Sequence, residues 1–128
     1  MTYLTLLLLI KISVTFIFVV LPFLFSSKER IEKLIFIQAN SPLFIRLYGV
    51  AILSLLVGYG SAIPLAQSGV FPWGILLMGL VSNSGASSLM FILGSGKQSR
   101  VFAIFFGAIA LLLVLAMAFP VTSLQKVW

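Results

Sequence analysis

The stretch "VFAIFFGAIALLLVLAMAFP", residues Val101 to Pro120, contains no charged side chain. A helix of about 20 apolar residues crosses the hydrocarbon core of a bilayer, which is about 30 Å thick. Backbone groups surrounded by lipid must pair within their own segment, so a lone stretch of this kind crosses as a helix and not as an open strand. The stretch therefore predicts a transmembrane helix.

Three further apolar segments of similar length precede it, and the expected spans are about 3–25, 42–62, 71–94 and 101–120. The whole chain of 128 residues is 62% hydrophobic and only 8% charged, whereas about 25% of residues are charged in soluble domains. We expect one all-α domain, an integral membrane bundle of four transmembrane helices. The first span is expected to be retained, because no basic residue precedes it and no A-x-A cleavage pattern follows it.

The connection between the first two spans, "SSKERIEKLIFIQANSP", is the longest polar stretch of the chain. Its apolar residues Ile31, Leu34 and Ile35 fall on one helical face and its charged residues on the other, which predicts a short amphipathic helix in the headgroup layer. The alternative is an extension of the first span into the cytoplasm. We also expect a capping box of Ser26 with Glu29, an i, i+4 pair of Glu29 with Lys33, and Ser41 as the cap of the second span.

The basic residues are distributed unequally between the two sides that four spans would create. The first and third connections, with their edges, carry Lys28, Arg30, Lys33, Arg46, Lys97 and Arg100, and the other side carries only Lys126 once Lys11 is counted as intramembrane. The positive-inside rule then places both termini outside the cytoplasm and the 1–2 and 3–4 loops inside it. The expected location is a bacterial inner membrane or a thylakoid-type membrane.

Four residues are expected at the membrane surfaces, where they would anchor the spans. Trp73 and Trp128, together with Tyr3, fall at the predicted outer boundary, where aromatic side chains are enriched. Arg46 lies one turn inside the second span, and we expect its side chain to extend to the cytoplasmic headgroups.

Small residues recur at helical spacing in two spans. Gly58 belongs to such a stripe in the second span, with Ala51, Ser54 and Ala62, and Gly107 to another in the fourth, with Ala103 and Ala110. Because lipid gives helices no hydrophobic reason to associate, close approach through small residues is what brings them together. Both stripes are predicted packing seams, and a path for a substrate is the alternative.

A polar patch, "VSNSGASS" at Val81 to Ser88, interrupts the third span. The hydroxyl groups of Ser82, Ser84 and Ser87 can bond to carbonyls of their own helix. Asn83 cannot satisfy its amide in that way, so we expect it to bond to a neighbouring helix. A polar lining for a ligand headgroup or pigment, and a helix broken at Ser84-Gly85, are the alternatives.

Lys11 is the one charged residue deep inside a span, about 12 Å of helix rise from Tyr3. A charge near the bilayer centre costs about 2.5–3.5 kcal/mol on insertion scales. One interpretation is that Lys11 reaches the outer interface along its flexible side chain. The other is that it meets a carboxylate or carbonyl of another subunit, or a lipid phosphate.

The side chains needed for most chemistry are missing from the sequence. It has no Cys and no His, and its two acids are Glu29 and Glu32, which lie among basic residues and indicate a solvated surface. We therefore expect no catalytic residue, no metal site and no cofactor held by a protein ligand, although lipid, quinone or pigment are candidates for binding between helices. "GSGK", Gly94 to Lys97, lacks the Ser or Thr and the preceding strand of a phosphate loop. The net charge of +6 forms no continuous basic face, so no nucleic-acid partner is expected.

The layout resembles one known family. A first span ends in "LPFLF" (Leu21 to Phe25), and an amphipathic link follows it. The link leads into "SPLFIRLYGVAILSLLVGYGSAI" (Ser41 to Ile63), in which "RLYG" is the most recognisable motif. In these features the chain resembles the DoxX-like small four-helix membrane proteins. The resemblance implies the same fold and permits association with quinone-linked membrane oxidoreductases, of which some DoxX-like proteins are small subunits.

Two functions remain after these exclusions. The first is a non-catalytic accessory subunit that packs against partner helices in a larger respiratory or photosynthetic complex, with membrane lipids and protein subunits as its partners. The alternative is a small transporter or channel, working as a homo-oligomer, for an anionic or lipid-like solute. An enzyme is not expected.

Overall fold

The computed structural model describes residues 1–35 and 42–127, except for the side chains of Leu34 and Ile35. All named elements of these residues are helices: α1 (Tyr3–Thr15), the π-helix η1 (Phe16–Val20), α2 (Leu21–Phe25), α3 (Lys28–Ile35), α4 (Pro42–Gln67), α5 (Trp73–Ile92), α6 (Lys97–Ala118) and α7 (Pro120–Ser123). Four helical rods are long and apolar enough to cross a membrane: Tyr3–Phe25, Pro42–Gln67, Trp73–Ile92 and Lys97–Ala118. The expected all-α, four-span architecture is confirmed to that extent.

The rods end at slightly different residues than expected. The second rod continues past residue 62 to Gln67, with Pro64 inside the helix. The third runs over 73–92 instead of 71–94, and the fourth over 97–118 instead of 101–120. Pro72 caps the start of the third rod, and the Gly96 backbone, with a φ of 91°, caps the start of the fourth. A positive φ of this kind is readily adopted by glycine, which explains why α6 begins before the apolar stretch does.

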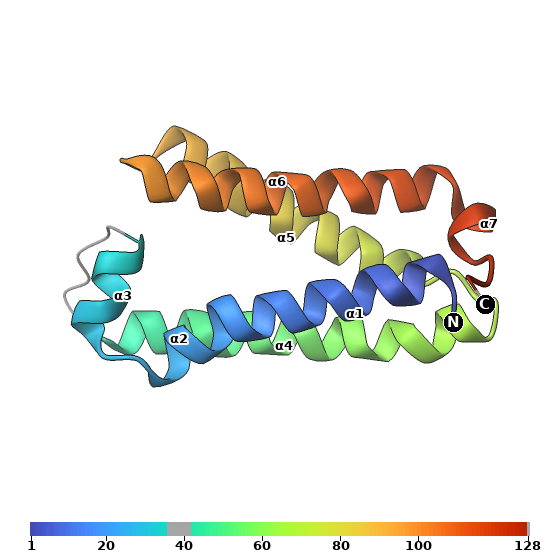
Figure 1. The fold of residues 1–128 in the computed structure, drawn as a ribbon, viewed down its shortest axis with the longest axis horizontal. Coiled ribbons are helices and arrows are strands. Elements are labelled where there is room, and N and C mark those ends of the chain that lie inside the picture. Colours follow the sequence, from blue (N-terminus) through green and yellow to red (C-terminus); the bar gives the residue numbers. More distant parts are fainter. Residues whose placement is uncertain (36–41, 128) are drawn as a thin grey trace.

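The four rods form two antiparallel hairpins (Figure 1). In the first hairpin, α1, η1 and α2 pack along α4, and in the second α5 packs along α6. The hairpins meet mainly through α5, which contacts α4 and runs obliquely from the end with the termini toward the other end of α6. By contrast, few residues of α1 and α6 are in contact with one another.

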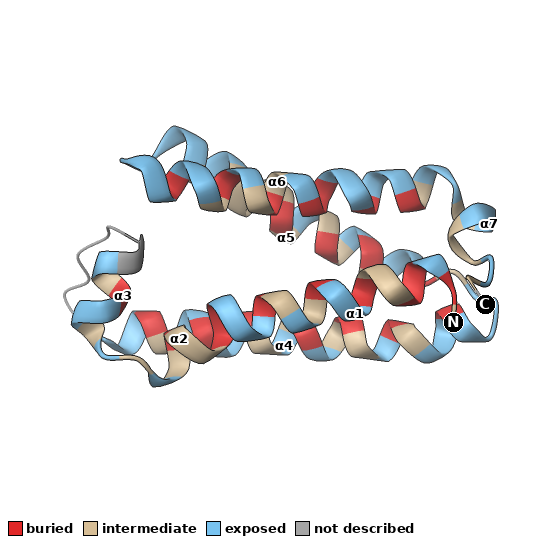
Figure 2. Ribbon diagram, in the orientation of Figure 1, coloured by how far each residue is buried: buried red, intermediate tan, exposed pale blue. Residues whose placement is uncertain are grey.

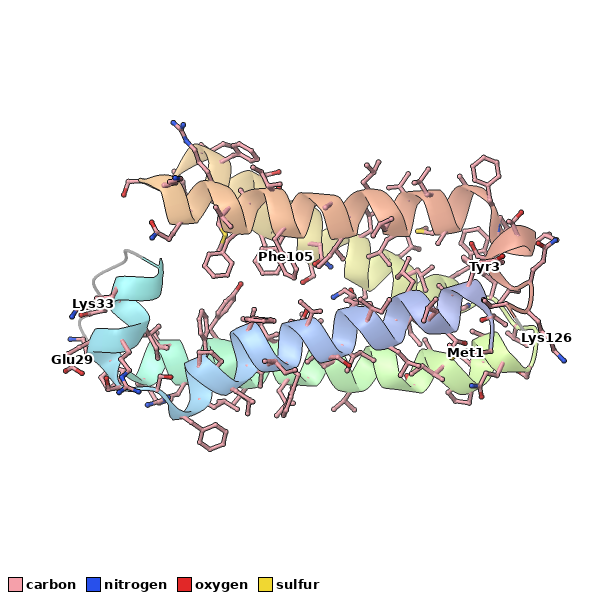
Figure 3. The ribbon with its side chains drawn as sticks, in the orientation of Figure 1. Met1, Tyr3, Glu29, Lys33, Phe105 and Lys126 are labelled. Atoms are coloured by element: carbon pink, nitrogen blue, oxygen red, sulfur yellow. The ribbon has the colours of Figure 1, made fainter. Side chains whose placement is uncertain are left out.

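The two ends of the chain meet at one end of the bundle. The backbone N–H of Val127 donates to the Met1 carbonyl at 2.9 Å, and the Tyr3 N–H donates to the Gln125 carbonyl at 3.2 Å. Met1 and Lys126 therefore lie together, whereas Glu29 and Lys33 of α3 lie at the opposite end (Figure 3). An even number of antiparallel rods places both termini at the same end, and the two hydrogen bonds bring them into contact.

The first rod is not a regular α-helix along its length. Between α1 and α2 it widens into the π-helix η1, where the Leu21 N–H bonds to the Phe16 carbonyl five residues earlier. Pro22 follows directly, and in a regular α-helix its ring would clash with the carbonyl four residues earlier. The proline gives a physical reason for the wider turn, which the sequence analysis did not foresee.

Helix α3 has the expected amphipathic character, with Ile31 buried and Glu29 and Lys33 exposed. The expected capping residue was wrong: Ser27, not Ser26, accepts the capping bond from the Arg30 N–H at 3.4 Å, and Ser26 is the C-cap of α2. Lys33 does act electrostatically on Glu29, as expected. Lys28 and Glu32 form an ion pair at 3.6 Å within the described part of α3, and Ser41 lies outside the described residues.

Buried residues are confined to the faces that the helices turn toward each other (Figure 2). Large apolar side chains cover much of the outside, among them Phe18, Phe44, Val81 and Leu111, each at least 60% exposed. Lipid is the solvent that such a surface favours. The structure thus has the composition and shape of an integral membrane protein.

Candidate functional site

Lys11 of α1 is buried against an aromatic ring of the neighbouring helix. Its side chain is only 8% exposed, and its Nζ atom lies 3.9 Å from the centre of the Tyr59 ring of α4. A cation over the face of a tyrosine ring is attracted by the negative potential of that face, and the more so where water is absent. The expectation that Lys11 extends to the outer interface was therefore wrong, because Tyr59 holds it inside the bundle.

Tyr59 links this lysine to the polar patch of α5. Asn83 Nδ2 donates to the Tyr59 hydroxyl at 3.2 Å and to the Gly79 carbonyl at 2.6 Å. A carbonyl only accepts, so the second bond fixes which end of the amide faces it. Asn83 thus makes the cross-helix bond that the sequence predicted, and the Tyr59 hydroxyl, which accepts here, keeps its own proton to donate.

Gly79 makes room for the Tyr59 hydroxyl. A Cβ atom added at Gly79 would overlap that hydroxyl and would lie 2.8 Å from the Tyr59 ring. Only a residue without a side chain allows α5 to approach Tyr59 this closely. Tyr59 was not among the residues expected to form a site, although a tyrosine within an apolar span was itself a signal.

The three polar side chains lie at similar depth in their rods. Lys11 is eight residues from the start of α1, Tyr59 eight from the end of α4, and Asn83 ten from the start of α5. At 1.5 Å per residue these positions are about 12–15 Å from the end of the bundle that holds the termini. We call Lys11, Tyr59, Asn83 and Gly79 the central cluster.

Thr15 lies one turn beyond Lys11, where α1 gives way to the π-helix. Its hydroxyl is buried and has no hydrogen-bond partner among the residues that the structure describes. A buried hydroxyl without a partner destabilises the fold, and π-helical turns often occur at functional sites. The Thr15 hydroxyl and the adjacent π-helix distinguish this turn from the regular α-helical turns of α1.

Among the serines of the polar patch, Ser87 joins two helices. The Ser87 hydroxyl donates across to the Ala103 carbonyl of α6 at 2.8 Å, whereas Ser84 bonds to Val81 within α5 at 3.4 Å. Ser82 is half-buried. Helix α5 is continuous from Trp73 to Ile92, so the alternative of a break at Ser84-Gly85 is wrong.

The predicted seam of α6 packs as expected, whereas that of α4 does so only in part. A Cβ at Gly107 of α6 would lie 3.0 Å from the Ser87 hydroxyl, and one at Gly58 of α4 would lie 3.1 Å from the Met78 methyl carbon. Each distance is tighter than ordinary van der Waals contact, so both helices approach α5 closely at these glycines. Ala51 and Ser54 of the predicted α4 seam are exposed, so that part of the prediction is wrong.

The expected surface anchors have different outcomes. Arg46 does not extend outward: its Nη1 donates to the Phe23 carbonyl at 2.7 Å and its Nη2 to the Ser26 carbonyl at 2.8 Å. These carbonyls at the end of α2 would otherwise lack partners, which explains the inward orientation. Trp73 is 48% exposed and lies 4.6 Å, ring to ring, from Phe71, and Trp128 lies outside the described residues.

The structure contains two large cavities besides the central cluster, and Lys11 lines one of them. One, of about 440 Å³, separates the two hairpins near the α5–α6 turn and is lined by residues including Phe23, Tyr48, Met90, Leu93, Ser99 and Phe102. We call it the hairpin cavity. Its lining is almost entirely apolar and aromatic, so it suits an apolar molecule.

The second hollow is a groove between α1 and α6, about 430 Å³ in volume, and Lys11 is part of its lining. Phe105 projects from α6 toward α1 beside it (Figure 3). A further hollow of about 380 Å³ continues it toward α7, since Tyr3, Leu7 and Leu112 line both. We call the combined feature the Lys11 groove.

The Lys11 groove holds a cation but no anion from this chain's side chains. Both carboxylates, Glu29 and Glu32, lie in α3, at the opposite end of the bundle (Figure 1). "GSGK" leads from the end of α5 into α6, at the end of the bundle opposite the termini (Figure 1). The buried ammonium group of Lys11 is thus the charge that this chain's side chains place in the groove.

No family model, curated protein or solved structure matches the chain.

Proposed function

We propose that the protein is a non-catalytic accessory subunit of a larger membrane complex, respiratory or photosynthetic, in which it packs against partner helices. The observation that carries the proposal is the incomplete closure of the bundle. Helices α1 and α6 leave the Lys11 groove between them, with Tyr3, Ile10 and Leu112 each about half exposed along it. In a membrane, close packing of a further helix into such a groove is what association relies on.

The hairpin cavity supports a second part of this proposal. Its volume and its apolar, aromatic lining suit the tail or ring of a bound lipid, quinone or pigment. Such a molecule would be held by shape, because the sequence has no His or Cys to bind it through a metal. The resemblance to DoxX-like proteins stays a prediction that agrees with this role.

The orientation of the subunit follows from its charges. The end that carries α3 and the α5–α6 turn holds six of the eight basic residues, and the end that carries the termini holds Lys126. The positive-inside rule supports placing the first end in the cytoplasm and the termini outside it.

Native mass spectrometry tests the role of accessory subunit. The protein would be extracted gently from its own membrane and its intact assemblies weighed, with bound small molecules released and identified afterwards. We expect defined complexes with other polypeptides. Recovery of the chain alone, or only as a homo-oligomer, would contradict the proposal.

A carrier for an anionic or lipid-like solute is the second candidate. It is favoured by one observation: Lys11 lines the Lys11 groove, and a second, apolar cavity lies near the α5–α6 turn. Such a carrier would move its solute when purified alone in lipid vesicles. Uptake of labelled fatty acid, lost on replacing Lys11 with Met, would support the carrier over the subunit.

A further inference from the structure

We propose that the Lys11 groove is the docking site for a transmembrane helix that carries an Asp or Glu at mid-depth, supplied by a different polypeptide. The inference rests on the proposed role as a subunit and names the surface and the chemistry of the contact. Two independent observations carry it: the shape of the groove and its unbalanced charge.

The residues that line each wall of the groove recur at the sequence spacing of a helix-packing seam. On α1, residues Tyr3, Leu7, Ile10 and Val14 line it, and on α6 residues Phe105, Ile109, Leu112 and Ala116 do so. Both sets follow alternating steps of four and three residues, which place side chains along one seam of a helix that packs at a shallow angle. A helix lying between them would contact both seams over about three turns.

The charge of Lys11 selects the partner. Tyr59 covers one side of the ammonium group through its ring face, but a ring is not a counter-ion. Ionisable residues within membranes pair with one another, since each lone charge is costly in lipid. A carboxylate on the docked helix, at the depth of Lys11, would provide the missing negative charge.

Two other sources of negative charge do not fit. A second copy of this chain has no acidic side chain in any span, because Glu29 and Glu32 both belong to α3. A lipid phosphate lies in the headgroup layer, whereas Lys11 is about 12 Å of helix rise inside Tyr3. A helix of another protein is the remaining occupant that brings a carboxylate to this depth.

Photo-crosslinking in native membranes tests the contact. A photoreactive amino acid would replace Leu112 in the groove or, as a control, Val57 on the exposed face of α4. We expect the Leu112 probe to capture a polypeptide that mass spectrometry identifies, with an Asp or Glu in the captured span. Capture of lipid alone, or of a span without an acid, would overturn the inference.

Variants of Lys11 test whether crosslinking by the Leu112 probe depends on the charge of Lys11. Because a lone carboxylate in lipid is as costly as a lone lysine, Lys11→Met should reduce capture more than about tenfold, and Lys11→Arg should retain it. Lys126→Met removes a charge outside the groove and should leave capture unchanged. An unaltered pattern from the Val57 probe shows that each variant is folded.

Exchanging Lys11 and the acidic residue of the partner tests whether the two side chains contact each other. Lys11→Glu should abolish capture, and replacing the identified partner acid with Lys should restore it. If complexes persist in native mass spectra while Lys11→Met leaves the groove contact intact, the docking inference fails and the role as a subunit survives. If the chain purifies alone, the role as a subunit fails, and the docking inference fails with it.

Discussion

Lys11 and Tyr59 stack in the middle of the first hairpin, with the lysine Nζ atom 3.9 Å from the centre of the tyrosine ring. The contact explains how a span with a charge near its centre remains buried within the bundle. Asn83 extends the contact to α5 through the Tyr59 hydroxyl, so one polar chain joins three of the four rods. The following predictions test this arrangement and the packing around it.

Replacing Gly79 with Ala should destabilise the bundle. The added methyl group would overlap the Tyr59 hydroxyl, and such overpacking typically lowers the free energy of unfolding by about 1–3 kcal/mol. Gly85→Ala is the matched control on the same helix, because its new methyl group would meet nothing within 4 Å. Reversible unfolding in mixed detergent measures both, and equal losses would contradict the predicted role of Gly79.

Replacing Ser87 with Ala should weaken the second hairpin modestly. Its hydroxyl donates to the Ala103 carbonyl at 2.8 Å, and hydrogen bonds between membrane helices contribute about 0.6 kcal/mol on average. The neighbouring Ser88 is exposed, so Ser88→Ala should leave the free energy of unfolding nearly unchanged. A larger loss for Ser88→Ala than for Ser87→Ala would show that the α5–α6 contact is wrongly placed.

Replacing Arg46 with Met should loosen the end of the first rod. The side chain donates to the Phe23 and Ser26 carbonyls, and hydrogen bonds to charged groups are worth about 1.5–3 kcal/mol. Arg100→Met removes one charge from the same predicted side, but Arg100 is exposed on α6. Amide hydrogen exchange should rise at α2 in the first variant only. Equal amide hydrogen exchange at α2 in Arg46→Met and Arg100→Met would favour a purely electrostatic role for Arg46.

Acidification should fray the start of α3. Hydrogen bonds to its own backbone amide and to the Ser27 side chain hold the pKa of the Glu29 carboxyl below its ordinary value. A lowered pKa means that the stabilisation is complete above the ordinary value and is lost as the pH falls through the folded pKa. Carbon NMR titration of Glu29 should show the low midpoint, and Ser27→Ala should raise it. A midpoint that Ser27→Ala leaves unchanged would contradict this account of the cap.

The sequence predicted the rods well because lipid imposes a simple length and composition on them. The apolar length of Val101 to Pro120 favours a helix that could cross a bilayer, and the structure has a helix over most of it. The amide of Asn83 favours a partner across a helix interface. The sequence could not predict which side chain would be the partner of Lys11 or of Asn83. Tyr59 is distant from Lys11 in the chain, and their contact depends on how α1 and α4 are rotated against each other.

Arg46 and the first rod illustrate the same limit. An arginine near a span end is usually explained by headgroups, but carbonyls at the end of α2 lie close enough to bind it. The π-helix η1 depends on where Pro22 places its missing N–H, and sequence periodicity does not report that. Tertiary proximity decided the first case and the local effect of a proline the second.

Cysteine accessibility tests the four-span arrangement most directly, because the chain has no cysteine of its own and every label reports one chosen position. Single cysteines would be placed at Ser27 before α3, at Ser68 after α4 and at Ser95 between α5 and α6, then exposed to a membrane-impermeant maleimide. We predict labelling of Ser68→Cys in intact cells, and of Ser27→Cys and Ser95→Cys only after permeabilisation. Labelling of Ser27→Cys and Ser68→Cys from the same side would contradict the four-span fold in the membrane.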